Sequence, residues 1–371
     1  MFALWLVVAG LGFGSVGSAA PEPIEMIRIA VGRFGDTTLE GQGLFVVDSA
    51  GVLLSKPENA KLRISIASSG LMLGGKAAGH DLVVVHAPLL KLAGHTYRGT
   101  LEVRLQVYDK KPELLIVHPL DLETYVTGIV SAELPQGWPL ASYQAQAVAA
   151  RTFAVMQKMR RIDLPYHMET TVLDQVYGGV EREHARAEEA AQTTRGQILG
   201  FHRHLAQTYF HAACGGHTES AQDGWGTALS YLPGSSCTKC NNTARSHWSV
   251  KITRSDVDRA FARLVGAPVV GIKITATTAT ARAKTVEIRT AKKATLITGA
   301  DFRRLLGWGV VWSTQIDKLE LTATTLEIEG RGSGHGVGLC QWGARGYAVA
   351  GGTYQAILAR YYPGARLTRL Y

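Results

Sequence analysis

The sequence predicts an α+β protein, in which a β-rich N-terminal part precedes a domain of mixed helices and antiparallel strands. Two observations support this prediction. Residues 27–119 contain short alternating or apolar runs separated by Gly, Asp, Asn and Lys, with no helical periodicity between them. After residue 119, helical patterns alternate with further short apolar runs. We therefore divide the chain into a leader at 1–20, a β-rich part at 21–118 and a second domain at 119–371.

The first twenty residues resemble a secretory signal peptide, because an uncharged apolar run ends in the small residues Ser18, Ala19 and Ala20. No Lys or Arg precedes the run, so an uncleaved anchor or a buried segment is the alternative. We expect export to the periplasm or cell envelope. No later stretch is long and apolar enough to span a bilayer, so we expect the mature protein to be soluble.

The β-rich part contains six runs that we expect to form antiparallel strands. They are apolar or alternate with polar residues, and turn-forming residues separate them. Antiparallel pairing is expected because no helix pattern separates the runs. The six runs are 27–34, 43–48, 62–67, 81–87, 101–108 and 114–119.

The second domain contains five segments that we expect to be helical. The clearest is 139–160, where Pro139 suits a first helical turn and Leu140, Ala147 and Ala154 recur on one face. The others are 120–134, 181–195 with Gly196 as its cap, a helix opened by Ser255 and ending near 266, and one from Thr353 to Pro363. Strands are expected at 198–201 and 205–213, with three or four more within 268–298 and 316–328.

The charge balance indicates an anionic partner. Thirty-nine basic residues face thirty acidic ones, which gives a net charge of +9. For an exported protein, wall polymers and lipid head groups are the natural anionic partners. A nucleic-acid partner is not expected, because no Lys/Arg run is interleaved with aromatic residues.

The first segment that could carry chemistry is residues 131–155, where Glu133 ends a predicted helix and Trp138 follows closely. A carboxyl beside Leu134 and Trp138 is partly desolvated, and desolvation raises the pKa of a carboxyl group. A raised pKa would make Glu133 a general acid near neutral pH. A solvated or salt-bridged glutamate fits the same residues.

The second segment is residues 211–226, where a Gly-Gly pair follows a predicted strand and lets the backbone approach a ligand closely. His211, His217, Glu219 and Asp223 are its polar candidates. A turn whose polar groups are all satisfied is the alternative.

The third segment is residues 330–348. Five glycines lie within 330–338 and flank His335, and Gln341 and Trp342 then enter a helix. The segment lacks the GxxxxGK[ST] pattern of a phosphate loop. Such a loop either admits a ligand to its backbone or forms a tight structural turn.

Together these segments resemble the sporulation stage II protein D and amidase-enhancer (SpoIID/LytB) family. The family pattern ELPxxWPLxxxxAQAVAARTF matches 133–153, GGxTxxxxxxWG matches 215–226, GHGVGxxQWGAxGxA matches 334–348, and YYPG matches 361–364. VHPLDLETYVTGIV resembles the family's entry into the domain, so the resemblance covers roughly 119–371.

The resemblance implies peptidoglycan as the substrate class and a lytic transglycosylase activity, with Glu133 as the catalytic residue. Other family members are described as activators of a cell-wall amidase, so a non-catalytic glycan binder with an amidase partner is the alternative. A lytic transglycosylase needs one carboxyl and no cofactor. The residues expected to contact glycan are Trp138, Arg151, His217, His335, Gln341 and Trp342.

The four cysteines are Cys214, Cys237, Cys240 and Cys340, and they leave three possibilities open: a zinc site, disulfides or free thiols. The CxxC spacing of Cys237 and Cys240 is typical of metal ligands, and four sulfurs, or three with His217, could hold a structural zinc ion. Two disulfides are the alternative in an exported protein.

Another zinc site is not expected. Some family members bind zinc through a His-Cys-Cys set, but the matching stretch YHMETTVLDQVYGG keeps His167 and has no cysteine. A zinc hydrolase is also disfavoured, because the chain has no HExxH pattern.

Overall fold

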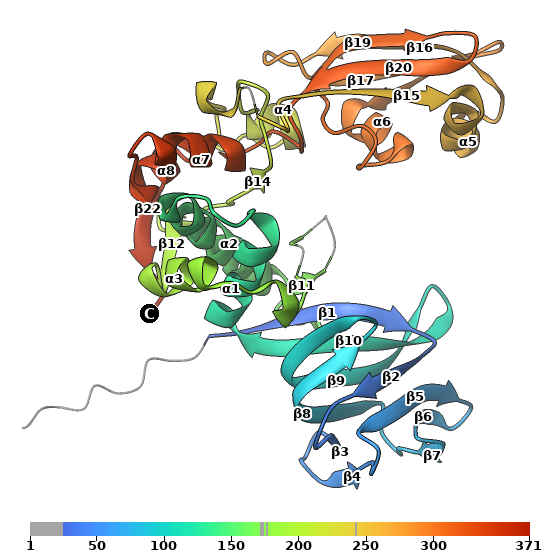
Figure 1. The fold of residues 1–371 in the computed structure, drawn as a ribbon. Coiled ribbons are helices and arrows are strands. Elements are labelled where there is room, and N and C mark those ends of the chain that lie inside the picture. The colour runs from blue at the N-terminus through green and yellow to red at the C-terminus, as the bar shows by residue number, and fades with distance from the viewer. Residues whose placement is uncertain (1–24, 171–173, 176, 242) are drawn as a thin grey trace, which may run out of the picture.

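The computed structural model describes residues 25–170, 174–175, 177–241 and 243–371 and has the α+β fold that the sequence predicts. Figure 1 shows three parts: a large N-terminal sheet, a central group of helices to which the C-terminal end of the chain returns, and a module of strands and helices. The predicted leader at 1–20 lies outside the described residues. Within the described ranges, no helix has the length and apolar character needed to cross a bilayer.

The N-terminal part is an eleven-stranded sheet with the path order β11-β1-β10-β9-β8-β2-β5-β6-β7, while β3 joins β4 to β8. All six predicted strands are present. The sequence analysis missed the short β2, β4, β6 and β7, which lie in polar or glycine-rich stretches. The strands are β1 (Met26–Phe34), β2 (Asp36–Glu40), β3 (Phe45–Val47), β4 (Leu53–Ser55), β5 (Lys61–Ala67), β6 (Gly70–Leu73), β7 (Lys76–Ala77), β8 (Leu82–Leu92), β9 (His95–Tyr108), β10 (Lys111–Asp121) and β11 (Met168–Glu169).

The pairing in this sheet is antiparallel apart from one short edge. β1 pairs with β10 in antiparallel register and with β11 in parallel register, where Ile29 lies opposite Met168. The chain leaves the sheet from β10, forms two helices and returns as β11 in the direction opposite to β10, which makes β11 parallel to β1. The prediction of antiparallel strands is therefore correct for the main sheet and incomplete at this edge.

The central part contains helices that pack on the sheet and on one another (Figure 1). One continuous buried core joins the sheet to the helices at 122–133, 140–160 and 185–193, with Ile29, Tyr125 and Ala147 among its members. The helices are α1 (Leu122–Glu133), α2 (Leu140–Arg160), η1 (Val180–Arg182), α3 (Ala185–Thr193), α4 (Ala221–Trp225), η2 (Thr238–Cys240), α7 (Gln341–Val349) and α8 (Tyr354–Tyr361). Its strands are β12 (Gln197–Phe201), β13 (His204–Leu205), β14 (Phe210–His211), β21 (Leu339–Cys340) and β22 (Arg366–Arg369).

Two predicted elements of the central part are shorter than expected. The helix predicted at 181–195 begins at Ala185, because the His184 side chain caps it by accepting from the Ala187 amide at 3.3 Å. The strand predicted at 205–213 contributes only its ends, to β13 and β14. β14 pairs in parallel with β21, so His211 lies opposite Cys340.

Residues 247–331 form a module with its own buried core around Phe261, Val286 and Phe302. Two three-stranded sheets and two helices compose it. Its first helix is capped by Thr253 rather than by the predicted Ser255, since the Thr253 hydroxyl accepts from the Asp256 amide at 3.3 Å. The elements are β15 (His247–Thr253), α5 (Arg254–Val265), β16 (Val269–Thr277), β17 (Ala283–Thr290), β18 (Ala294–Thr298), α6 (Gly299–Leu306), β19 (Ile316–Leu321) and β20 (Thr325–Arg331).

A buried ion pair joins α1 to α2 inside the central part. The Arg151 side chain is 0% exposed and donates from Nε and Nη2 to the two oxygens of Glu123, at 2.8 and 2.6 Å. Glu123 also accepts from the Gly196 amide and the Tyr371 hydroxyl, at 3.1 and 2.5 Å. Arg151 donates further to the Gln197 carbonyl at 3.0 Å. The pair therefore ties both helices to β12 and the C-terminal residue.

We expect Arg151→Met to lower the unfolding free energy by about 3–5 kcal/mol, because it leaves the Glu123 charge buried without its partner. Thermal and denaturant unfolding would measure the loss. The double variant Arg151→Met/Glu123→Leu should recover part of it, since no buried charge then remains. Arg186→Met, which changes an exposed arginine of α3, is the matched control and should have little effect. Equal melting temperatures for the Arg151 and Arg186 variants would contradict the prediction.

Candidate active site

Glu133 is the last residue of α1, and its position follows from how that helix ends. Asp121 begins the helix by accepting from the Thr124 amide at 2.9 Å. Pro135 follows closely after Glu133, and the Tyr143 hydroxyl of α2 donates to the Pro135 carbonyl at 2.6 Å. The turn between the two helices is therefore anchored on both sides. It leaves the Glu133 side chain half-buried at a helix end.

Gln341, the first residue of α7, contacts this carboxyl. Its amide Nε2 donates to Glu133 Oε2 at 3.2 Å, across 208 positions of the chain. Two hydrogen bonds next to Gln341 hold it in place. The Cys340 sulfur caps α7 by accepting from the Gly343 amide at 3.3 Å, and the Trp342 amide donates to the Ala212 carbonyl at 3.0 Å. The predicted residues Glu133 and Gln341 thus belong to one site.

Two tryptophans lie beside this contact. The rings of Trp138 and Trp342 have centroids 4.9 Å apart and are tilted by 58°. Trp138 is only 6% exposed, so it supports its neighbour rather than presenting a face of its own, whereas Trp342 is half-buried. The Arg345 guanidinium lies 5.8 Å from the Trp138 centroid and 5.3 Å from that of Trp342. The site therefore combines a carboxyl, an amide, an aromatic face and a cation.

Sequence reasoning missed Arg345. The signal was present, because Arg345 follows Trp342 by three positions on a predicted helix and such pairs share a face. Arg345 Nε has no hydrogen-bond partner within the part of the chain that the structure describes. Its guanidinium lies over both rings.

A second carboxyl near the site is already neutralised. Burial raises the pKa of Tyr125 well above its ordinary value, and the negative charges of Asp174 and Glu133 raise it further, so both carboxyls lie near this phenol. Asp174 is paired with Arg161 at 2.5 Å and accepts from the Glu169 amide at 2.9 Å. Asp174 is thus engaged with Arg161 and with the backbone of β11.

Both ring nitrogens of His335 form hydrogen bonds to backbone atoms in or beside the glycine-rich loop. Its Nε2 lies 2.8 Å from the Phe210 carbonyl, and its Nδ1 accepts from the Val337 amide at 3.1 Å, so the ring is neutral with the proton on Nε2. Burial lowers the pKa of His335 to about 4. His211 packs against it at 5.4 Å and donates from Nδ1 to the Val337 carbonyl at 3.1 Å. The two rings thus brace the loop against β14, and neither contacts Glu133 in the described structure.

Two further predicted contacts lie apart from the carboxyl. Arg151 belongs to the buried pair with Glu123 and has no exposed surface, so the structure assigns it to the interior. His217 is exposed, and its Nδ1 lies 2.7 Å from the Thr218 carbonyl, on the loop that bridges to Ser236. The chemical type of a residue in a motif does not reveal whether its side chain lies beside Glu133 or elsewhere.

The remaining polar residues of the second glycine-rich segment attach the module. Glu219 is buried and accepts from the hydroxyls of Thr278 and Thr280, at 2.6 and 2.5 Å. These threonines and Arg282 lie in the turn between β16 and β17. Asp223 accepts from Ser220 inside the cap of α4. The segment therefore docks the module instead of lining the carboxyl site.

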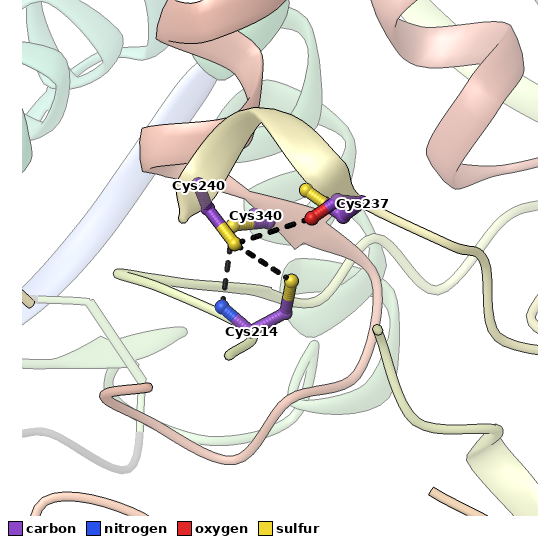
Figure 2. A group of neighbouring side chains, drawn as sticks. All are labelled: Cys214, Cys237, Cys240 and Cys340. Atoms are coloured by element: carbon purple, nitrogen blue, oxygen red, sulfur yellow. Dashed lines mark hydrogen bonds between the residues drawn. The ribbon is translucent and has the colours of Figure 1, made fainter. Parts of the chain in front are cut away.

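The four cysteines come together behind the site. All are buried and none forms a disulfide. Their sulfur atoms lie within 4.8 Å of one another, and Figure 2 shows the side chains turned toward a common centre from three chain segments. His217 is exposed and is not part of this group. Cys340 directly precedes Gln341, so the cluster and the carboxyl site share a backbone.

His167, the remaining residue of the family's His-Cys-Cys set, is committed to the sheet. Its Nδ1 accepts from the Arg28 amide at 3.2 Å, and burial lowers its pKa to about 4. A shallow hollow lined by Arg28, Arg104 and His167 lies there, and Glu133 is not among its lining residues. Part of the stretch that follows, 171–173, lies outside the described residues.

These features define an α+β protein in which one candidate acid, Glu133, accepts from the Gln341 amide, and Gln341 directly precedes a tryptophan of the aromatic pair. The family model for the stage II sporulation protein matches residues 110–201. An uncharacterized protein of Brachyspira hyodysenteriae is 34% identical over 252 residues, which cover 68% of this chain and 67% of the relative.

Two named relatives of Bacillus subtilis are more distant. The amidase enhancer is 26% identical over 65% of this chain and 40% of its own length. Stage II sporulation protein D is 27% identical over 68% of this chain and 76% of its own length. The chain belongs to the stage II sporulation protein D and amidase-enhancer family, as its motifs predict.

We expect acid to destabilise the glycine-rich loop. Burial holds the pKa of His335 at about 4 and that of His211 well below its ordinary value. The unfolded histidines titrate near about 6.5, so the unfolded state binds more protons below that pH. The stabilisation is complete above about pH 6.5 and is lost as the pH falls toward about 4. Thermal melts between pH 7 and 5 should therefore show a falling melting temperature.

The matched variants are His335→Gln and His204→Gln. The first removes a titrating group but keeps a donor for the Phe210 carbonyl, so its melting temperature should depend less on pH. The second changes an exposed histidine of β13 and should follow the unmodified protein. A melting temperature that is constant from pH 7 to 5 would rule out this role for the buried rings.

Proposed function

We propose that this protein is a peptidoglycan lytic transglycosylase that cleaves the bond between N-acetylmuramic acid and N-acetylglucosamine. One observation carries the proposal: the Glu133 carboxyl accepts from the Gln341 amide at 3.2 Å, next to the Trp138–Trp342 pair. The two family segments that contain these residues, 131–155 and 330–348, are far apart in sequence and meet at this carboxyl. Family membership supports the substrate class.

The proposed reaction needs one carboxyl. Glu133 protonates the glycosidic oxygen as the bond from this oxygen to muramyl C1 breaks. The resulting carboxylate then accepts the proton of the muramyl C6 hydroxyl, whose oxygen forms a bond to C1. The product is a 1,6-anhydro ring and Glu133 is protonated again. The nucleophile belongs to the substrate, so neither a water-activating second carboxylate nor a cofactor is required.

The surrounding side chains suit a glycan chain. Half-buried Trp342 offers an aromatic face on which a sugar ring can stack, and Trp138 supports it from behind. The Gln341 amide, already turned toward Glu133, positions the carboxyl and can contact an N-acetyl group. The net charge of +9 favours association with anionic wall polymers, and we propose that the protein is exported to the cell envelope.

The second candidate is a glycan-binding activator of a cell-wall amidase. The similarity to a relative named amidase enhancer favours it. In this case the same tryptophans would bind glycan, and Glu133 would have no chemical role. The two candidates differ in one product, because only the transglycosylase makes anhydro ends.

Glu133→Gln should reduce glycan cleavage about 10²–10⁴-fold, since the amide has the same shape but cannot donate and retake a proton. Purified glycan strands would be digested and their anhydro ends counted by mass spectrometry. Glycan binding and the melting temperature should stay nearly unchanged. Glu188→Gln, an exposed change on α3, is the matched control and should cleave normally. Undiminished cleavage by the Glu133 variant would remove it as the acid, and no cleavage by the unmodified protein would favour the activator.

Gln341→Ala should lower kcat about 10- to 100-fold with a smaller effect on KM, because a hydrogen bond to a charged group contributes about 1.5–3 kcal/mol. Trp342→Ala should instead weaken glycan binding and raise KM. Steady-state kinetics of the two variants would separate positioning from binding. If both variants changed KM alone, the Gln341 amide would be a substrate contact rather than a partner of Glu133.

A further inference from the structure

Four thiols at one buried point call for an explanation that the proposed reaction does not supply. Cys214 follows β14, and Cys340 ends β21. Cys237 directly precedes the turn η2, and Cys240 is its last residue. The sulfur atoms lie within 4.8 Å of one another and all four residues are 0% exposed (Figure 2). Three separate chain segments therefore present soft ligands to a closed space.

Several hydrogen-bond donors point at these sulfur atoms. The amides of Cys214 and Gly343 each donate to the Cys340 sulfur at 3.3 Å. The Tyr361 hydroxyl lies 3.1 Å from the Cys237 sulfur and can donate to it. Donors of this kind surround metal-bound thiolates and hold them in position. A disulfide sulfur is a much poorer acceptor and would use these donors weakly.

The surroundings also carry a buried positive charge. Arg282 is 2% exposed and donates from Nη2 to the Cys214 carbonyl at 2.6 Å. Its Nε and Nη1 have no hydrogen-bond partner among the described residues, and the Glu219 carboxylate lies 3.9 Å from Nε. Four thiolates around a divalent cation carry a net charge of −2, and a buried guanidinium offsets part of it. Two disulfides are neutral and would add no negative charge to that of the Glu219 carboxylate beside Arg282.

We propose that Cys214, Cys237, Cys240 and Cys340 bind one zinc ion in a closed tetrahedral site that fixes the start of α7. Zinc prefers four thiolates in this geometry, and a four-sulfur site leaves no open position for water. The ion is therefore structural. It ties the CxxC turn and the segment after β14 to Cys340, the residue before Gln341.

The consequence for the carboxyl site rests on the proposed function. The Cys340 sulfur caps α7, and Gln341 reaches Glu133 from the first position of that helix. Loss of the metal would release the cap and the amide together. Cleavage would then fall although the metal touches neither Glu133 nor the substrate.

Metal content and intact mass test the binding itself. The purified full chain should contain about one zinc ion per molecule and have the mass of four reduced cysteines. A strong chelator should lower its melting temperature, since metal binding is coupled to folding, and a reductant alone should not. Replacement by cobalt should produce the visible absorption of tetrahedral thiolate coordination. A metal-free protein that is lighter by four hydrogen atoms would overturn the proposal in favour of disulfides, and an iron-loaded or metal-free reduced protein would overturn it as well.

Two conservative variants locate the site without dismantling it. Tyr361→Phe removes one donor to Cys237 and should lower zinc affinity about tenfold in a chelator competition, as loss of outer-shell hydrogen bonds does. Tyr347→Phe is the matched control: its hydroxyl has no described partner, and its ring lies 6.3 Å from that of Tyr361. Equal affinities in the two variants would contradict the proposed site.

Glu133→Gln keeps the two proposals separate. That variant should retain one zinc ion and the same chelator sensitivity while it loses cleavage. Cys237→Ser should lose zinc and reduce cleavage together, and the fall in melting temperature that accompanies it should match that of the chelated protein. Full metal loading in Cys237→Ser would exclude a four-sulfur site whatever the protein does to glycan.

Discussion

β14 and β21 pair in parallel over only two residues each, yet this pairing brings His211 opposite Cys340 across 129 positions of sequence. Around this pairing, the backbone lies so close to neighbouring atoms that a residue with a Cβ atom would not fit. Gly338 has φ 74°, and a Cβ there would lie 2.1 Å from the Tyr209 carbonyl oxygen. Gly336 has φ 87°, and a Cβ there would meet the Arg282 guanidinium at 2.5 Å. Three features lie on the two chain segments that these glycines let approach: Gln341 of the candidate site, Cys214 and Cys340 of the cysteine cluster, and Glu219, which attaches the module.

Most of the fold and the centre of the site were predictable from local patterns. Alternating runs predicted the main strands, and Pro139 together with a seven-residue apolar repeat predicted α2. Glu133 and Gln341 were predicted from family motifs and the structure joins them. The pattern did not indicate which polar residues point inward. Arg151 and His335 lie in the same motifs, but their partners, Glu123 and the Phe210 carbonyl, are remote in sequence, so their burial depends on tertiary contacts that no local window contains.

The other omissions have the same origin. The independent core of residues 247–331 was not predicted, because strands within one sequence stretch do not reveal whether they join an existing sheet or make a new one. Arg345 was missed although its spacing from Trp342 was visible, since exposed arginines on helices are common. The family motifs therefore contain two kinds of residue. Some, such as Glu133 and Gln341, meet at the candidate site, and others hold distant segments in register so that the first group can meet.

The module also has a topological property. Its first and last strands, β15 and β20, are antiparallel neighbours, and His247 at one end lies opposite Arg331 at the other. The chain therefore enters and leaves the module at nearly the same place. A segment inserted in this way can lengthen, shorten or diverge in sequence without altering the path of the surrounding backbone. The glycine-rich segments on either side, by contrast, are constrained by their contact with each other.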